Sequence, residues 1–410
     1  MKASWKPTAD LVIRNARVYT VDLSVAEIKA GKTDFTVLEN GAVAAKDGRT
    51  IAVGEIDERL IGSETRVIDA GGKTLLPGLI DSHMHAMFAG TELMSVNFKE
   101  TRTKEELVRL LREKAAVTEK GLWIKGCEWN ELVWDVKTAP TKADLDQAST
   151  EHPIMCCRLC HHVYVVNSAA LALAGITRDT KDPDGGIIGR DGDGNPNGLL
   201  YENSAMGLID DVIPPLTEEE LICAIEGIGR VMNSFGITAC IDANMTFEQM
   251  RAYGQARRQG RLRYRENMMF YLDKAWGDVA YHLRRIREMT AVTGFGDEML
   301  KFNGIKVTLD GIPATGTAAM RKPYEHMPET SGYTTITEDE MLAVARESAK
   351  HNWQIGVHCC GDRSADVAIK AFIEAYRLNP SDARHYIIHH AVYQPDQLPL
   401  MRQYDIPITV

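Results

Sequence analysis

The sequence predicts an α/β protein whose main part is a TIM-type (β/α) barrel. Short apolar runs recur along the second half of the chain, and capped helical patterns separate them. Several of these runs end in a histidine, where the C-terminal ends of barrel strands would converge. The residues before the first such run instead alternate between apolar and polar, which is typical of a separate β-domain with one solvated face.

Residues 1–72 are predicted to form the N-terminal part of a small β-sandwich domain. Apolar residues alternate along Asp10 to Asp22, as in a strand with one buried face. Two further candidate strands, Gly41 to Lys46 and Thr50 to Gly54, flank Asp47-Gly48. That dipeptide favours a two-residue hairpin turn, so we expect these segments to pair.

Residues 73–99 contain the first barrel strand and a pair of histidines. The segment Pro77 to His85 reads P-G-L-I-D-S-H-M-H, and its apolar start predicts a strand buried on both faces. His83 and His85 lie two positions apart, so on a strand both imidazoles point to one side and can reach the same ion. The pair alone is a weak signal, because a buried histidine is more often held by hydrogen bonds.

Further candidate metal ligands follow at other predicted strands along the chain. His358 and His390 each close a short apolar run, and Lys306 lies inside another, Phe302 to Leu309. An ammonium group within an apolar strand is unfavourable unless it is paired or modified. Because strand C-termini meet on one face of a barrel, these residues would become neighbours. Together they predict a metal site formed by His83, His85, Lys306, His358 and His390.

Residues 100–216 separate the first barrel strand from the next, which we expect at Gly236 to Asp242 in the remaining barrel, residues 217–410. A connection this long must carry its own fold and should cover the strand C-termini. We therefore expect it to shape the substrate pocket. Capping boxes predict helix starts after Thr103, Thr217 and Thr337.

The chain resembles the amidohydrolase superfamily, and within it the YtcJ-like branch that includes N-substituted formamide deformylases. Besides P-G-L-I-D-S-H-M-H, the segments that carry the resemblance run in family order: P-T-K-A-D-L-D from Pro140, C-H-H-V-Y-V-V-N-S-A-A-L from Cys160, K-V-T-L-D-G from Lys306, V-H-C-C-G-D from Val357 and R-H-Y-I-I-H-H-A from Arg384. The resemblance implies a metal-dependent hydrolase barrel. It also implies that the four histidines named above are ligands and that Lys306 is the bridging lysine, which many relatives carry in carboxylated form.

The sequence departs from this resemblance in two places. His389 stands where the family usually has Glu, which alters a contact to the metal ligand or to the substrate. The chain ends at Val410, where a seventh strand begins, so the strand-eight Asp of the family has no counterpart. The catalytic acid or base is therefore unassigned. We expect the sequence to be part of a longer chain, or a short form completed by a partner.

The expected function is hydrolysis of an amide or other C–N bond, in an N-acyl or N-formyl amine or a cyclic amide. Hydroxide would form on one or two divalent ions, with zinc as the expected metal. His162, Asp310 and His389 are substrate-binding candidates, although each could equally be a hydrogen-bonded structural residue. Two alternatives stay open: a metal-binding relative without hydrolase activity, and isomerase, deaminase or decarboxylase chemistry at the same site.

Composition, charge and the cysteine residues restrict the expected location and partners of the protein. With 410 residues, 44% of them hydrophobic, and no visible leader or long apolar segment, we expect a cytoplasmic protein that does not enter a membrane. A net charge of −10 opposes nucleic-acid binding and leaves a small molecule as the expected partner, with the oligomeric state open and a homo-oligomer included. Cys359 and Cys360, beside His358, are interpreted as reduced, buried thiols.

Overall fold

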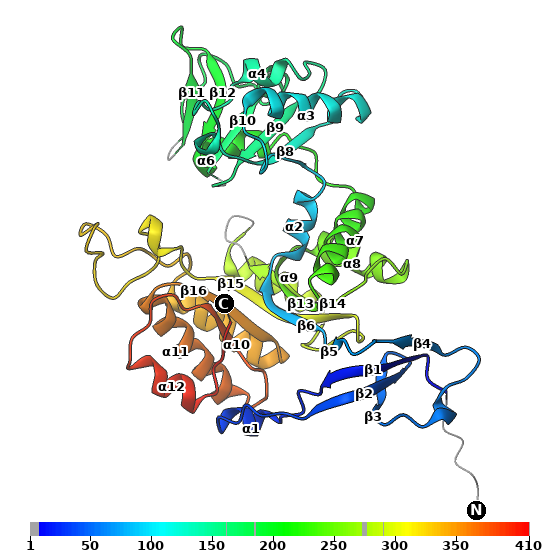
Figure 1. The fold of residues 1–410 in the computed structure, drawn as a ribbon. Coiled ribbons are helices and arrows are strands. Elements are labelled where there is room, and N and C mark those ends of the chain that lie inside the picture. The colour runs from blue at the N-terminus through cyan, green and yellow to red at the C-terminus, as the bar shows by residue number, and fades with distance from the viewer. Residues whose placement is uncertain (1–7, 161, 184–185, 273–276, 290, 410) are drawn as a thin grey trace, which may run out of the picture. The chain divides into compact units, whose positions relative to one another are not determined.

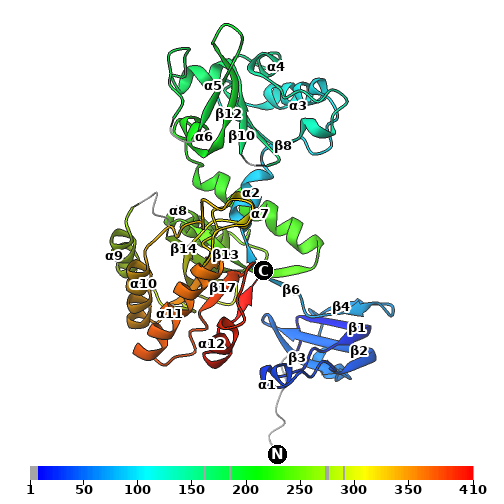
Figure 2. The ribbon, with the colours of Figure 1, turned by 90° about the vertical axis from the view of Figure 1, so that its left-hand side faces the viewer.

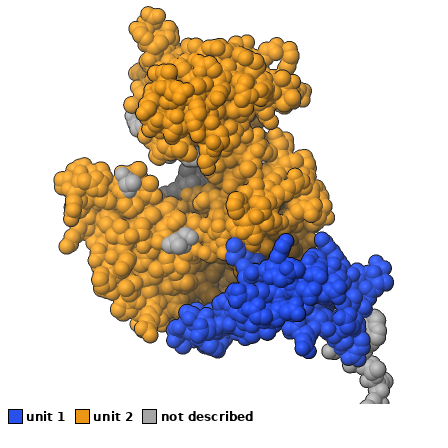
Figure 3. Space-filling model, viewed as in Figure 1, with its two compact units in different colours: residues 1–79 blue, residues 80–410 orange. Residues whose placement is uncertain are grey.

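The computed structural model describes residues 8–160, 162–183, 186–272, 277–289 and 291–409. The chain divides into two compact units, Met1–Leu79 and Ile80–Val410, coloured blue and orange in Figure 3. The predicted domain boundary after residue 72 therefore falls inside the first unit.

The first unit is built on a small mixed β-sheet. Its strands are β1 (Leu11–Tyr19), β2 (Val37–Lys46), β3 (Arg49–Gly54), β4 (Arg66–Asp69) and β5 (Thr74–Leu75), accompanied by α1 (Val25–Lys29) and η1 (Glu58–Leu60). β1 pairs antiparallel with β2 and parallel with β4 and β5. β2 and β3 form the predicted hairpin, in which Asp47 and Gly48 have φ angles of 49° and 74°. Positive φ at both positions matches the twist of the flanking strands.

The barrel of the second unit is a seven-stranded sheet. Its strands, in sheet order, are β6 (Leu79–Met84), β13 (Ile237–Met245), β14 (Arg265–Leu272), β15 (Leu300–Thr308), β16 (Gln354–Cys359), β17 (Tyr386–His389) and β18 (Ile408–Thr409). Neighbours from β13 to β18 pair in parallel. Ser82 on β6 and Thr409 on β18 are linked by a 2.5 Å hydrogen bond between their hydroxyls. This contact brings the first and last strands of the sheet together, and the ribbon in Figures 1 and 2 shows the curl of the sheet.

Helices follow the strands and cover the outside of this sheet. They are α2 (Ala86–Glu92), α7 (Glu218–Ser234), α8 (Phe247–Arg258), α9 (Val279–Met289), α10 (Glu338–His351), α11 (Asp362–Leu378) and α12 (Gln397–Gln403). The capping boxes predicted at Thr217 and Thr337 are both present, at the starts of α7 and α10. The apolar faces of α9, α10 and α11 bury a shared core against β14 to β17 (Figure 2). No helix among the described residues is long and apolar enough to cross a membrane.

The interior of the barrel is filled by side chains. Ala243, Met269, Tyr386 and Ile388 form one buried cluster there. Gly356 on β16 makes room for it, because a Cβ at this position would lie 2.7 Å from the Tyr386 ring. The Tyr386 hydroxyl lies 2.8 Å from the Met269 sulfur. The barrel centre is therefore a packed layer beneath the strand ends rather than a channel.

The segment between β6 and α7 carries a sheet of its own. Its strands are β7 (Val96–Asn97), β8 (Ile124–Trp129), β9 (Ile154–Arg158), β10 (Val163–Val166), β11 (Ile187–Arg190) and β12 (Pro196–Tyr201), in the order β11-β12-β10-β9-β8-β7. Its helices are α3 (Lys104–Val117), α4 (Lys142–Asp146), α5 (Ser168–Leu173) and α6 (Glu202–Asp210), with the short turn η2 (Glu131–Val133). Thr103 caps α3, but the Glu106 carboxylate accepts from the Arg102 N–H, so the predicted box is shifted by one residue.

The first barrel strand differs from its prediction. The apolar start of β6 was expected to be buried on both faces, yet Leu79 is 53% exposed and Ile80 is 71% exposed. β6 is an edge strand of the described sheet, with β13 as its neighbour. Side chains on such a strand have sheet neighbours on one side, and their burial depends on what else covers them.

Candidate functional site

Histidines from three barrel strands meet at the C-terminal end of the barrel. The ring centroids of His83 and His85 lie 5.1 Å apart, those of His83 and His389 5.1 Å, and those of His358 and His389 4.7 Å. His83 lies on β6, His358 on β16 and His389 on β17, while His85 occupies the N-cap position of α2. The structure thus brings His83, His85 and His358 together, as the sequence predicted, and adds His389. We call these four residues the histidine cluster.

Lys306 lies beside the histidine cluster on β15 and is 3% exposed. Burial lowers the pKa of its ammonium to about 8. Burial first, and then the nearby charge of Lys306, lower the pKa of His83 to about 3 and that of His358 to about 4. The imidazoles are therefore neutral near pH 7, the form in which a ring nitrogen has a lone pair for a metal.

One atom of the histidine cluster lacks a partner. Nδ1 of His83 is buried and has no hydrogen-bond partner among the described residues. A buried polar atom without a partner is unfavourable, and such atoms often contact an ion or a water molecule. Neutral imidazoles are also good ligands for zinc and similar divalent ions. The donors present therefore fit a divalent metal ion.

Among the described residues, no hydrogen bond or ring contact joins His390, which the sequence predicted as a ligand, to the histidine cluster. Its Nε2 lies 3.4 Å from Oε1 of Gln397, and its ring centroid lies 6.0 Å from that of Tyr393. His389 and His390 have φ angles of 75° and 48°. Positive φ is strained for residues with a side chain, and such residues gather at functional sites. This backbone turns His389 toward His83 and His358, and His390 toward α12.

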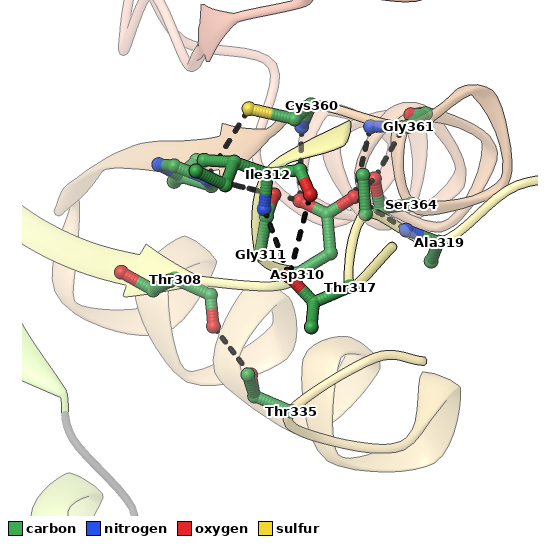
Figure 4. A network of polar contacts seen from close by, with 12 residues as sticks. Thr308, Asp310, Gly311, Ile312, Thr317, Ala319, Thr335, Cys360, Gly361 and Ser364 are labelled. Carbon is green, nitrogen blue, oxygen red and sulfur yellow. Dashed lines mark hydrogen bonds and ion pairs between the residues drawn. The ribbon is translucent and has the colours of Figure 1, made fainter. Parts of the chain in front are cut away.

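Asp310 anchors the end of β15 to the start of α11 (Figure 4). Its carboxylate is fully buried. Oδ2 accepts hydrogen bonds from the N–H groups of Ala319 and Gly361 and from the Ser364 hydroxyl, at 2.6 to 2.9 Å. Oδ1 accepts one from the Cys360 N–H at 2.9 Å. Of the two roles open to Asp310 from the sequence, these contacts favour the structural one.

A second group of metal-ligating atoms lies next to Asp310. The Cys360 sulfur lies 3.4 Å from Nε2 of His358, and Oδ1 of Asp310 lies 3.9 Å from the same nitrogen. One ligand atom from each of these three residues falls within 4.8 Å of the others. Sequence reasoning missed this group, because it treated Cys360 as a packed thiol. The available signal was a cysteine two residues after a strand-ending histidine.

His162, the third substrate-binding candidate, lies at the start of β10 and pairs with Glu202. Its Nδ1 is 2.9 Å from a Glu202 carboxylate oxygen, and the Glu202 N–H donates to the His162 carbonyl at 2.9 Å. Both side chains are well exposed, and Glu202 has a φ of 66°. The pair orients the His162 ring while leaving it open to solvent.

Two buried acids behind His85 were also missed. Asp242 on β13 accepts from the Met87 N–H at 2.8 Å and the Asn244 N–H at 3.1 Å. Glu266 on β14 accepts from the Asp242 N–H at 3.1 Å and from the Cys240 thiol at 3.1 Å. Burial raises the pKa of Asp242 to about 6 and that of Glu266 well above its usual value. The available signal for Asp242 was its position as the last residue of the predicted strand Gly236 to Asp242. His358 was identified from a similar position at the end of an apolar run.

Known proteins resemble the chain over most of its length. It is 27% identical over 376 residues to a putative amidohydrolase, YtcJ, of Bacillus subtilis, and this match covers 89% of the chain and 68% of that protein. It is 26% identical over 386 residues to an N-substituted formamide deformylase of Arthrobacter pascens, covering 91% of the chain and 67% of that protein. It is 24% identical to the protein LONG AFTER FAR-RED 3 of Arabidopsis thaliana, of which it spans 64%.

Solved structures support the fold. A structure described as an uncharacterized metal-dependent hydrolase from Pyrococcus furiosus matches with a TM-score of 0.74 at 23% identity, covering 97% of this chain and 76% of that one. Another such structure, from Pyrococcus horikoshii, matches with a TM-score of 0.75 at 22% identity, covering 98% and 74%. The sequence model of the amidohydrolase family matches residues 66–406. The chain therefore belongs to the amidohydrolase family.

Proposed function

We propose that this chain carries the metal centre of a hydrolase that cleaves amide or other C–N bonds outside peptides. The observation that carries the proposal is the histidine cluster beside the buried Lys306, in which the buried atom Nδ1 of His83 has no partner among the described residues. Membership of the amidohydrolase family supports hydrolysis. Similarity to a protein named N-substituted formamide deformylase supports N-formyl and N-acyl amines as substrates, with cyclic amides as the next class to test.

The ligands in this proposal are His83, His85, Lys306 and His358, with His389 in the place that the sequence assigned to His390. They would hold one or two divalent ions, zinc in our proposal. An ion bound there lowers the pKa of a coordinated water and polarises the carbonyl to be attacked. The neutral imidazoles contribute by keeping their lone pairs available at neutral pH.

Lys306 is proposed to react with carbon dioxide, because its burial favours the neutral amine. With a pKa of about 8, part of its population is a free amine near neutral pH. The amine lone pair can form a C–N bond to carbon dioxide, and loss of a proton from nitrogen then yields a carbamate anion. A carbamate on Lys306 would supply oxygen ligands for divalent ions, whose charge would offset the cost of a buried anion.

His162 is proposed to contact the substrate. With the proton on Nδ1 donated to Glu202, its Nε2 keeps a lone pair and can accept a hydrogen bond from a substrate N–H or O–H. His389, the other histidine among the substrate-binding candidates, is instead taken as a metal ligand in this proposal. The acid that protonates the leaving amine stays unassigned.

The test combines metal content with a substrate panel. Zinc per chain is measured by mass spectrometry after purification, and release of amine is followed from N-formyl amines, N-acyl amines and cyclic amides. We expect about one to two zinc equivalents and turnover of one class. A variant with His83→Asn and His85→Asn should lose both. A wild-type chain without metal would overturn the proposal, and metal without turnover of any class would favour a non-hydrolytic relative.

A further inference from the structure

The imidazole of His358 lies between two groups of ligands. One face of the site is the histidine cluster, whose His389 ring lies 4.7 Å from that of His358. The other is formed by Cys360 and Asp310, which approach Nε2 of His358 to 3.4 and 3.9 Å. Figure 4 shows Cys360 and Asp310 converging from the end of β16 and the loop after β15.

The spacing of these three residues suits a single thiophilic ion. Zinc bonds sulfur at about 2.3 Å and imidazole nitrogen at about 2.0 Å, so two ligand atoms of a tetrahedral ion lie roughly 3.3 to 3.7 Å apart. The observed separations of 3.4 and 3.9 Å need little change to reach this range. Three protein ligands with one open position is also a common arrangement for zinc.

Nε2 of His358 also lies 3.5 Å from the Gly311 carbonyl oxygen, so binding an ion through this nitrogen requires the tautomer with its proton on Nδ1. Oδ1 of Asp310 accepts one described hydrogen bond, from the Cys360 N–H, whereas Oδ2 accepts three, so Oδ1 keeps a lone pair. The Cys360 sulfur lies beside Nε2 of His358 and is one of the three ligand atoms that fall within 4.8 Å of one another. Binding of a divalent ion then forms a metal–sulfur bond and releases the thiol proton to solvent.

We propose that Asp310, His358 and Cys360 form a second metal site, for thiophilic divalent cations such as Cd²⁺ or excess Zn²⁺, and that this site competes with the histidine cluster for His358. A neutral imidazole has one lone pair. If Nε2 binds an ion at Cys360, the ring proton stays on Nδ1, and His358 cannot ligate an ion in the histidine cluster. The second site is therefore inhibitory, because filling it removes a ligand from the first.

Cadmium is the probe for the site itself, because a cadmium–thiolate bond gives a charge-transfer absorption in the ultraviolet. The metal-free full chain is titrated with CdCl₂ as wild type and as Cys360→Ser. We expect the wild type to bind about one more Cd²⁺ per chain through a thiolate than the variant does. This difference would appear as a larger, saturable absorption. The exposed thiols of Cys160 and Cys223 supply a background common to both proteins. Cys223→Ser is the matched control and should keep the component that depends on Cys360.

Competition is measured by zinc affinity of the histidine cluster with and without one equivalent of Cd²⁺. We expect cadmium to weaken zinc binding on the order of tenfold in the wild type and not in Cys360→Ser. Equal cadmium spectra for the two proteins would overturn the site, and unchanged zinc affinity would overturn the competition. A cadmium spectrum in a protein that binds no zinc would keep this site and sink the proposed function. Cys360→Ala replaces the serine variant if thermal unfolding shows the latter to be misfolded.

Discussion

The Asp242 carboxylate accepts a 2.8 Å hydrogen bond from the backbone N–H of Met87, which joins β13 to the start of α2. α2 begins directly after His85, and His85 occupies the N-cap position without making a side-chain capping hydrogen bond. The first N–H groups of a helix need acceptors, and a negative charge there is favourable. Asp242 supplies both, and it is thereby a positioning residue for the H-x-H segment.

Asp242→Asn should weaken metal binding on the order of ten- to a hundredfold, as expected when the support of a ligand is lost. Asn has one side-chain oxygen, while the two Asp242 oxygens accept separately from Met87 and Asn244. Leaving one buried N–H unpaired should cost about 1–3 kcal/mol of unfolding free energy. Zinc competition titration and urea unfolding measure the two effects. Asp211→Asn, at an exposed position after α6, is the control, and equal zinc affinity of both variants would contradict the role.

Glu266→Gln should raise the unfolding free energy relative to wild type, and this gain should grow as the pH rises above about 4.5. Burial raises the pKa of Glu266 in the folded state, so the folded state holds a proton that the unfolded state has already lost. The ionisation of Glu266 therefore lowers the unfolding free energy of the wild type as the pH rises. Gln cannot ionise, so the difference in unfolding free energy between variant and wild type should grow in favour of the variant from pH 5 to pH 8. Urea unfolding at a series of pH values measures it, and a difference independent of pH would show that Glu266 ionises normally.

Most of the barrel could be predicted from local sequence. β15, β16 and β17 are buried parallel strands, which read as continuous apolar runs, and each prediction ended within a few residues of the observed strand. β14 (Arg265–Leu272) was not identified, because Arg265, Glu266 and Asn267 interrupt its apolar pattern. The exposure of Ile80 on β6 could not be predicted either, since it depends on neighbours far along the chain.

The candidate site could be predicted only in part, because local sequence locates strand ends but does not reveal long-range contacts. Strand ends located His83, His85, Lys306 and His358, but the choice between His389 and His390 rests on two positive φ angles that no local pattern reveals. Adjacent side chains on an extended chain point to opposite faces, so a small backbone change exchanges their roles. The anchoring role of Asp310 depends on where α11 begins, which is set by tertiary packing.

His389→Asn and His390→Asn separate the two assignments. If His389 is a ligand, its loss should lower zinc affinity on the order of tenfold or more, while His390→Asn should retain zinc. His390 contacts Gln397 in a buried setting, so its replacement should instead lower stability by about 1 kcal/mol. Zinc content after dialysis and urea unfolding distinguish these results. Loss of zinc in the His390 variant alone would restore the assignment made from the sequence.

Glu202→Gly tests whether the strained backbone beside His162 is kept for function. Glu202 has a φ of 66°, which is unfavourable for any residue with a side chain and free for glycine. Relief of strain and the greater flexibility of glycine roughly cancel, so stability should change by less than about 1 kcal/mol. The variant nevertheless removes the carboxylate that holds His162 through Nδ1, so the rate on a turned-over substrate should fall on the order of tenfold or more. Glu202→Gln, which keeps a hydrogen-bond acceptor, should recover part of that rate. Comparing kcat/KM of the three proteins with their urea unfolding decides the matter, because a structural role for Glu202 would lower stability and leave the rate per folded molecule unchanged.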